Sequence, residues 1–220
     1  MGPVMHMIVF EDSQILVCRK PAGVVSEDGG LPALLKEQRG LPELYCVHRL
    51  DRETSGLMVY AKTGRAAAAL SAAIAAREMR KEYLAVVPGE APAAGEWRDL
   101  LYRDRQKNKS YVVKRTRRGV REAVLRFETL ARQGGFCLVR IELETGRSHQ
   151  IRVQFASRGF PLVGDGKYGS RDREAPLALF AAALSFPHPV TGERLRFTAE
   201  PPDSYPWTLF SDRQEKPPEP

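Results

Sequence analysis

The stretch that decides the fold of this chain is VHRLDRETSGLMVYA, residues 47–61. Its last five residues, 57–61, are all hydrophobic, so both faces of the segment can be buried, as in a central strand of a sheet. The residues before them are mostly polar and include the turn-forming types that often precede a strand. Asp51 is therefore predicted to lie on a loop directly before a core strand.

Helix and strand signals continue on both sides of this stretch. Helices are predicted at residues 31–39, 64–80 and 148–158; cations near residue 80 suit the end of the second, and Ser148 is the expected cap of the third. Short β-prone runs predict strands at residues 8–10, 15–18, 83–87, 124–130, 136–143, 179–186 and 195–198. Many strands in hairpin order with few helices indicate an α+β fold with a largely antiparallel, mixed sheet.

The chain shows no internal repeat and no linker long enough to separate two domains. Residues 1–210 are therefore predicted to form one domain, and the polar, Pro-rich residues 211–220 are predicted to be a disordered tail.

The composition is that of a soluble globular protein. Of its 220 residues, 43% are hydrophobic and 28% are charged, which excludes wholesale disorder. The longest apolar stretch, residues 66–76, is too short to cross a bilayer and lies inside the chain, so no membrane association is expected. Three widely spaced Cys without a CxxC pair, and four His that do not cluster, predict free thiols, a cytoplasmic location and no metal site.

The positive charge is concentrated in one segment. The chain has a net charge of +7, and residues 98–121, called the basic segment below, contain ten Lys or Arg against two Asp, a balance of +8. Its centre has the pattern of a hairpin closed near Gly119. Such a segment is either a solvated surface loop or an arm that follows a phosphate backbone through counterion release. Charge alone leaves RNA, DNA and acidic proteins open as partners.

The residues that could take part in catalysis or binding are ambiguous when each is considered alone. Asp51 lies between Arg49 and Arg52 and could simply be a loop carboxylate in an ion pair. Tyr83, on a predicted strand, could be an ordinary core residue. The Gly-Asp-Gly at residues 164–166 could cradle a phosphate or only form a turn, since it lacks a Walker lysine pattern. No GxSxG elbow supports a serine hydrolase.

Five motifs, taken together and in order, resemble the RluA-type RNA pseudouridine synthases. They are KPAG at residues 20–23, HRLDRETSGL at residues 48–57 followed by Ala61, KEYLA at residues 81–85, TGRSHQIRV at residues 145–153 and GFPLVGDGKYG at residues 159–169. The match extends from about residue 11 to residue 202, nearly the whole folded region. Five matching motifs make the resemblance specific.

The resemblance implies the pseudouridine synthase fold and the isomerisation of uridine to pseudouridine in RNA, without a metal or an organic cofactor. Asp51 matches the aspartate described as the family's nucleophile. Tyr83 matches the tyrosine that stacks on the target base, and Arg152 matches the basic residue that pairs with the aspartate. His48 and Arg49 adjoin Asp51 and are candidates to hold the flipped strand or fill the gap that it leaves.

These residue types suit the chemistry. Breaking a glycosidic bond and rejoining it through carbon requires a carboxylate that stays ionised in a dry pocket, and an adjacent guanidinium opposes the protonation that burial favours. A covalent carboxylate intermediate divides one difficult step into two easier ones. Because the reacting atoms are hidden in a base stack, the nucleotide must first be flipped out.

Two positions differ from the family pattern. Gln154 stands where the fourth motif usually continues to His, and Phe180 occupies the His position of a late LHA-like segment. Neither is the expected nucleophile or its partner, so activity is still expected. Altered substrate contacts or local hydrogen bonding could follow from them.

The sequence therefore predicts a monomeric RNA-modifying enzyme without an obligate protein partner, acting on structured RNA, with rRNA favoured over tRNA. Besides the catalytic Asp51, Tyr83 and Arg152, its RNA-binding residues are predicted to be His48, Arg49, Lys107, Lys109, Lys114, Arg115, Arg117, Arg118 and Arg147. Two alternatives stay open: a non-catalytic RNA-binding protein on the same scaffold, and a hydrolase that uses Asp165 as a second carboxylate.

Overall fold

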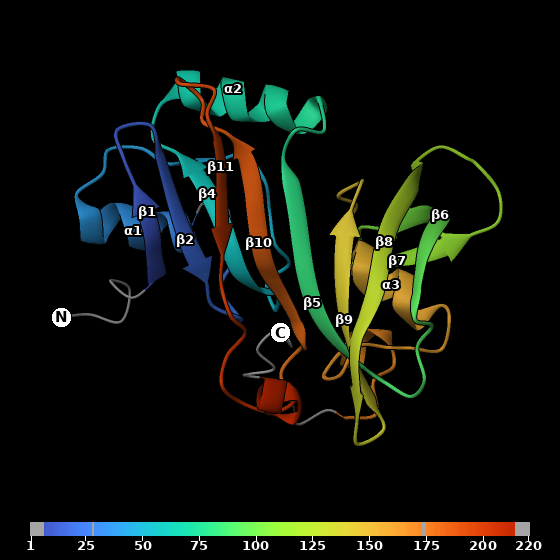
Figure 1. Ribbon diagram of the computed structural model, residues 1–220. Helices are drawn as coiled ribbons and strands as arrows, with labels where there is room; N and C mark the ends of the chain where they lie inside the picture. The colour runs from blue at the N-terminus through green and yellow to red at the C-terminus, as the bar shows by residue number, and fades with distance from the viewer. Residues whose placement is uncertain (1–6, 28, 173–174, 214–220) are drawn as a thin grey trace, which may run out of the picture. The chain divides into compact units, whose positions relative to one another are not determined.

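The computed structural model describes residues 7–27, 29–172 and 175–213 (Figure 1). The chain divides into two compact units. Unit 1 holds the described residues up to Tyr83 together with residues 142–144 and 180–200, and unit 2 holds residues 84–141, 145–179 and those from 201 onward. Strand β5 (Arg80–Pro88) begins in unit 1 and ends in unit 2. Each unit is thus assembled from separate stretches of sequence, and the predicted single domain of residues 1–210 stays a prediction.

The sheet of unit 1 is built around the strand that follows Asp51. This strand is β4 (Ser55–Ala61), and every residue in it after Ser55 is buried. Its neighbours in the sheet are β2 (Ile15–Lys20) and the short β3 (Tyr45–Cys46), both antiparallel to it, and β10 (Leu179–Pro187), parallel to it. The outer strands, β1 (Ile8–Glu11) and β11 (Arg194–Thr198), pair antiparallel with β2 and β10. The prediction of a central strand after Asp51 is confirmed.

Helix α2 (Gly64–Ala75) packs its apolar stripe on this sheet (Figure 1). The side chain of Thr63 caps it by accepting a hydrogen bond from the backbone N–H of Ala66. Leu70 joins the core cluster, and burying such a side chain contributes about 1.5–3 kcal/mol. The predicted helix over residues 64–80 is too long, because Arg77 adopts a left-handed backbone with φ of 59° and the chain then enters β5. The cations expected at the helix end therefore lie in a turn and a strand.

Gly56 explains why the signature requires a glycine where β4 begins. Its φ is 117°, and a Cβ there would lie 2.4 Å from the carbonyl oxygen of Ala181 in the neighbouring β10. Because a real side chain cannot approach backbone so closely, only glycine allows β4 and β10 to pair at this point. Helix α1 (Leu31–Arg39) has the predicted bounds and ends at Gly40, whose backbone is left-handed.

The sheet of unit 2 has the strand order β9-β8-β6-β7. Its strands are β6 (Ala94–Asp104), β7 (Lys109–Val113), β8 (Val120–Gln133) and β9 (Phe136–Leu143). β6 pairs antiparallel with both β7 and β8, so the basic segment does contain a hairpin, but the predicted closure near Gly119 is wrong. The hairpin is formed by β6 and β7 and closes at residues 105–108, whereas the turn at Gly119 leads from β7 to β8, which lie on opposite sides of β6. β6 begins at Ala94, soon after the prolines and glycines that follow β5.

Helix α3 (Gln150–Ala156) covers one face of this sheet. Its Val153 packs with Leu101 of β6 and Ala123 of β8, and the ring centroid of Phe155 lies 4.6 Å from that of Trp97. The predicted helix over residues 148–158 is too long at both ends. Ser148 is not its cap: His149 holds that position with a φ of 54°, and no side chain caps the helix.

Two 3-10 helices, η2 (Gly166–Tyr168) and η3 (Trp207–Arg213), complete the described elements. η3 includes the first three residues of the predicted tail, Ser211–Arg213, and the rest of that tail lies outside the described residues. The described residues form eleven strands and three α-helices, with antiparallel pairs and the parallel β4–β10 pair, which confirms the α+β class. Within the described ranges, no helix is both long and apolar enough to span a membrane.

Candidate active site

A buried lysine holds the loop that carries Asp51. Lys20, at the end of β2, is only 1% exposed, and its Nζ donates to the carbonyl oxygens of Pro21, Val24 and Arg52 at 2.8, 2.7 and 2.9 Å. Burial lowers the pKa of Lys20 to about 8, although nearby carboxylates, among them Asp51, oppose the shift. The ammonium group therefore stays largely charged at neutral pH and ties the KPAG turn to the loop. The sequence showed this lysine only as part of a turn motif.

His48 fastens the other end of the same loop. Its ring is 7% exposed, and its Nε2 accepts the backbone N–H of Val59 in β4 at 3.1 Å. Burial, and then the charge of Lys81, lower the pKa of His48 well below its usual value, so the imidazole is neutral at pH 7. Nearby, the Oγ of Ser26 donates to the carbonyl of Leu50 at 2.9 Å. The side chain of His48 thus faces the interior, and its predicted contact with RNA stays a prediction.

Asp51 and Tyr83 belong to unit 1, and the charge of Asp51 acts on the phenol of Tyr83. Asp51 is half-buried on the loop before β4, where its carbonyl accepts the N–H of Thr54 at 3.0 Å. Tyr83 is 5% exposed, and burial together with the negative charge of Asp51 raises the pKa of its phenol above the usual value. The phenol is therefore neutral at physiological pH. The catalytic roles that the resemblance implies for Asp51 and Tyr83 stay predictions.

Unit 1 holds two further cations near the loop residues His48 and Asp51. Arg49 is exposed at the rim, where its Nη1 donates to Glu27 Oε1 at 2.7 Å. Lys81 is half-buried and forms no ion pair within the described part of the chain; burial lowers its pKa to about 8. Its place in the KEYLA motif, two residues before Tyr83, was the available signal, but the sequence did not suggest a role for it.

Arg152 has a carboxylate partner that the sequence did not predict. Its Nε and Nη2 donate to Oδ2 and Oδ1 of Asp165 at 2.7 and 2.8 Å, and both side chains are buried in unit 2. A Cβ on Gly164 would lie 2.2 Å from the carbonyl oxygen of Pro176, so glycine is needed to bring Asp165 to this position. The predicted pairing of Arg152 with Asp51 joins residues of two units and stays a prediction.

Tyr168 connects the Arg152 region to the basic segment. Its hydroxyl accepts the backbone N–H of Ser110 in β7 at 2.8 Å and lies 2.9 Å from Nδ1 of His149. Its ring lies under the guanidinium of Arg152, 5.2 Å from the Cζ atom, and the Nζ of Lys109 lies 5.1 Å from the same ring. One tyrosine therefore contacts the helix cap, the buried arginine and the first strand residue of the basic hairpin.

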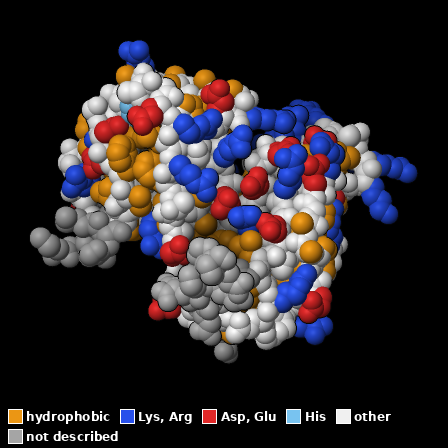
Figure 2. All heavy atoms as spheres, viewed as in Figure 1, with side chains coloured by type: hydrophobic (Ala, Val, Ile, Leu, Met, Phe, Trp, Pro, Cys, Tyr) orange, Lys and Arg blue, Asp and Glu red, His pale blue; other side chains and the backbone are white. Residues whose placement is uncertain are grey.

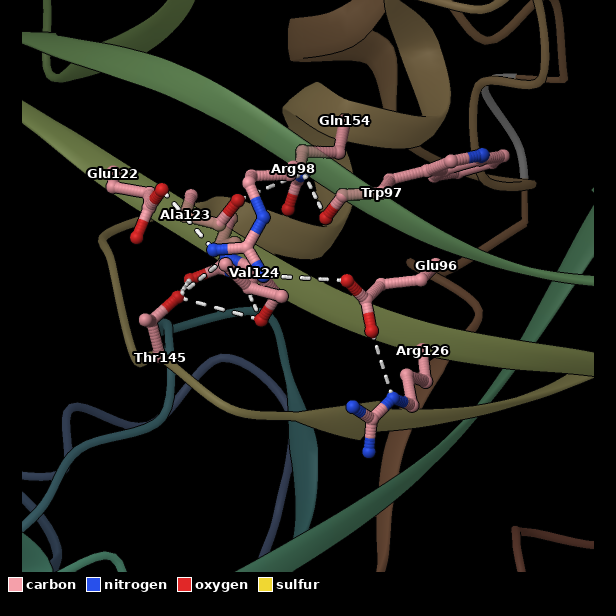
Figure 3. Close-up of polar contacts among 10 residues, drawn as sticks. Glu96, Trp97, Arg98, Glu122, Ala123, Val124, Arg126, Thr145 and Gln154 are labelled. Carbon is pink, nitrogen blue, oxygen red and sulfur yellow. Dashed lines mark hydrogen bonds and ion pairs between the residues drawn. The ribbon is translucent and has the colours of Figure 1, made fainter.

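The middle of the unit 2 sheet carries a neutralised row of charges. Figure 3 shows Glu96 between Arg98 and Arg126, with Arg98 also reaching Glu122. Arg140 and Glu128 form a further ion pair on β9 and β8. Because these cations already have carboxylate partners, they attract a phosphate backbone less than unpaired cations would.

The far end of the same sheet carries cations without such partners. Figure 2 shows Lys and Arg side chains projecting where β7 leads into β8. Four predicted RNA-binding residues of the basic segment are exposed and form no ion pair among the described residues: Lys107, in the turn between β6 and β7, and Lys114, Arg115 and Arg118, which follow β7. Two others, Lys109 and Arg117, lie over tyrosine rings instead. Arg147 is exposed, and its Nε donates to the carbonyl of Glu122 at 2.8 Å.

The two departures from the family pattern are both buried. Gln154 is fully buried, and its Nε2 donates to Asp99 Oδ2 at 2.7 Å, while its Oε1 has no hydrogen-bond partner among the described residues. Arg158 also binds Asp99, through Nη1 at 2.8 Å and Nη2 at 3.1 Å. Phe180 is 2% exposed in β10, with the guanidinium of Arg19 5.5 Å from its ring centroid. Gln154 and Phe180 are therefore both buried side chains, each with a contact to a charged residue, Asp99 and Arg19 respectively.

The chemistry available here is that of a carboxylate, a neutral phenol and nearby cations. Among the described residues, no group of three His, Cys, Asp or Glu side chains could hold a metal ion. The structure brings Asp51, Tyr83, Lys20 and His48 into one unit, while Arg152, Asp165 and the basic segment belong to the other.

Comparison with known proteins defines first the class and then the family. The fold is similar to that of the human RNA pseudouridylate synthase domain containing 4, with a TM-score of 0.80 and 25% identity over 98% of this chain and 96% of that one. The family model for RNA pseudouridylate synthase matches residues 14–157, a range that includes Asp51, Tyr83 and Arg152. The chain therefore belongs to the RNA pseudouridylate synthase family, as the RluA-type motifs predicted, and is an isomerase that converts uridine to pseudouridine.

Bacterial relatives match over nearly the whole chain. A Pseudomonas aeruginosa protein named ribosomal large subunit pseudouridine synthase D is 37% identical over 95% of this chain and 72% of its own length. A Vibrio vulnificus protein of the same name is 36% identical over 94% of this chain and 72% of its own length.

Proposed function

We propose that this enzyme modifies uridine in rRNA and that Asp51 is its nucleophile. The assignment of the nucleophile rests on the position of Asp51. Its loop is held in place by the buried Lys20, and its carboxylate is close enough to the buried Tyr83 to raise the pKa of the phenol. The names of the relatives support rRNA as the substrate.

The reaction balances without an added reagent. Attack by the Asp51 carboxylate on the nucleoside releases the bond between C1′ of the ribose and N1 of the uracil. The base, held against the Tyr83 ring, turns so that C5 faces the ribose, and a bond forms between C5 and C1′. The carboxylate leaves, C5 loses its proton and N1 gains one, so product and substrate are isomers. The flipped nucleotide must occupy this position, which costs a few kcal/mol of unstacking.

We also propose that the basic segment supplies RNA affinity and that the protein acts in the cytoplasm as a monomer. The unpaired cations of the segment, among them Lys114 and Arg115, support the first part, since counterion release gives affinity in proportion to the phosphates that are neutralised. Light scattering of the purified protein with and without RNA tests the monomeric state, and a stable dimer would contradict it.

The decisive experiment compares Asp51→Asn with the wild-type protein on unmodified rRNA transcripts carrying tritium at C5 of uridine. The variant is expected to release no tritium while its RNA affinity stays within about twofold. Glu53→Gln removes an exposed carboxylate from the same loop and is the matched control, with near-normal release expected. Tritium release by Asp51→Asn at the wild-type rate would exclude this nucleophile, and modification of tRNA but not rRNA would overturn the substrate class.

A further inference from the structure

The end of the β6–β7 hairpin carries two tyrosines side by side on one face. Tyr102 of β6 and Tyr111 of β7 are directly opposite in the antiparallel register. Opposite residues of such a pair share a face, with their Cβ atoms about 4.5–5.5 Å apart. Tyr111 is 36% exposed and is one of the few large hydrophobic side chains on the surface of the described chain.

The other face of the hairpin is buried against α3. The residues that alternate with the tyrosines, Leu101 and Ser110, are 4% and 2% exposed, and Leu101 packs with Val153 of α3. Because successive side chains of a strand point to opposite faces, Tyr102 and Tyr111 point away from α3. Their exposure is therefore a property of the sheet face and not of a loose loop.

Cations lie on these rings and around them. The guanidinium of Arg117 lies 4.6 Å from the ring centroid of Tyr102, and the Nζ of Lys109 lies 5.8 Å from that of Tyr111. The exposed Lys114 and Arg115 follow directly after β7 and form no ion pair among the described residues. The neighbouring part of the sheet, in contrast, has the paired charges of Glu96, Arg98 and Glu122.

We propose that Tyr111, with Tyr102 beside it, is a stacking platform for unpaired nucleobases of the substrate RNA that lie outside the target uridine. Proteins often bind single-stranded nucleic acids with aromatic rings on an open sheet face. The bases stack on these rings, and nearby cations bind the phosphate backbone of the nucleic acid. A flat ring accepts any base, so the platform contributes affinity without reading sequence. The proposal rests on the proposed action on RNA and extends it to a second contact.

Salt dependence separates stacking from charge. Tyr111→Leu, which keeps an apolar side chain without a ring, is expected to weaken binding of an unstructured RNA oligonucleotide about tenfold at every salt concentration, with an unchanged slope of log affinity against log salt. Tyr111→Phe, which keeps the ring, is expected to bind within twofold of wild type. The double variant Lys114→Gln and Arg115→Gln should instead reduce the slope by about 1.4, since each phosphate that a cation neutralises on a single strand contributes about 0.7 to the slope.

Tyr45→Leu is the matched control, because Tyr45 is 40% exposed in unit 1, outside the basic segment, and should bind RNA normally. Fluorescence anisotropy with the oligonucleotide and with its duplex measures all of these, and circular dichroism verifies folding. Normal binding by Tyr111→Leu, or equal losses in Tyr111→Leu and Tyr111→Phe, would overturn the proposal. Failure of the proposed function has a different signature: the wild-type protein would then form no pseudouridine in rRNA, while the effect of Tyr111→Leu on oligonucleotide binding would persist.

Discussion

Arg152 and Asp165 form a two-point ion pair in unit 2, with Nε 2.7 Å from Oδ2 and Nη2 2.8 Å from Oδ1. Both side chains are buried, and the Arg152 guanidinium also lies over the ring of Tyr168. A planar guanidinium held at two nitrogens along one edge and on one face has little rotational freedom. Asp165 is thus better explained as the group that orients Arg152 than as the second acid of a hydrolase.

Asp165→Asn should therefore destabilise the protein and lower its activity. The amide cannot accept two charged hydrogen bonds, so the variant breaks the buried ion pair that Asp165 forms with the Arg152 guanidinium, at a cost of about 3–5 kcal/mol. Urea unfolding followed by circular dichroism measures this cost. Full stability and full pseudouridine formation in this variant would show that the pair does not position Arg152.

The titration of Tyr83 should report the charge of Asp51. Burial and that charge both raise the pKa of the phenol. Asp51→Asn removes the charge but keeps the burial, so the pKa of Tyr83 should fall and yet stay above that of a free tyrosine. Ultraviolet difference titration of each background against its Tyr83→Phe counterpart isolates this phenol. An unchanged pKa in Asp51→Asn would mean that the two groups do not interact.

His48 should make the protein less stable in mild acid. Its pKa in the folded state lies well below the reference value of 6.5, so below pH 6.5 the unfolded chain binds a proton that the folded chain does not. Stability is then lost as the pH falls, by up to about 1.4 kcal/mol per pH unit for this one group. His48→Gln, which can still accept the Val59 N–H, should flatten the profile between pH 7 and pH 5. Equal slopes for both proteins would contradict the assignment.

Lys20→Met should release the Asp51 loop. Methionine has a similar length but no donors, so three backbone carbonyls near the loop would lose their partner. The expected loss of stability is on the order of 3 kcal/mol, with a larger drop in kcat than in RNA affinity. Denaturant unfolding and steady-state tritium release measure the two effects. A variant with normal kcat would show that the loop keeps its position without this lysine.

Gln154→Leu should have only a small effect. The amide donates to Asp99, but Arg158 binds the same carboxylate through both of its terminal nitrogens, and the substitution also removes a buried carbonyl that has no partner among the described residues. Replacing both a donor and an unsatisfied acceptor by an apolar group of similar size is expected to change stability by less than about 1 kcal/mol. A loss above about 2 kcal/mol in thermal unfolding would assign Gln154 a larger role.

Local signals in the sequence were sufficient for several elements and for the family. The bounds of α1 and β9 were predicted correctly, because glycines flank α1 and directly precede β9, and the residues within each element have a consistent pattern. Five motifs in order identified the family, and the apolar run after Asp51 placed this residue before a central strand. Chain order and side-chain type are properties of the sequence itself, so these inferences did not depend on distant contacts.

Tertiary structure decided which groups meet and which are buried. Local helix propensity favoured a helix to residue 80, but α2 ends at Ala75 and β5 begins at Arg80, because strand pairing outweighs a preference of a few tenths of a kcal/mol per residue. The partner of Arg152, the three carbonyls around Lys20 and the inward-facing ring of His48 involve backbone or residues that the sequence does not distinguish from their neighbours. The sequence alone thus determined the reaction and the fold class, whereas burial and long-range hydrogen bonds, which exist only in the folded chain, decided how the site is held together.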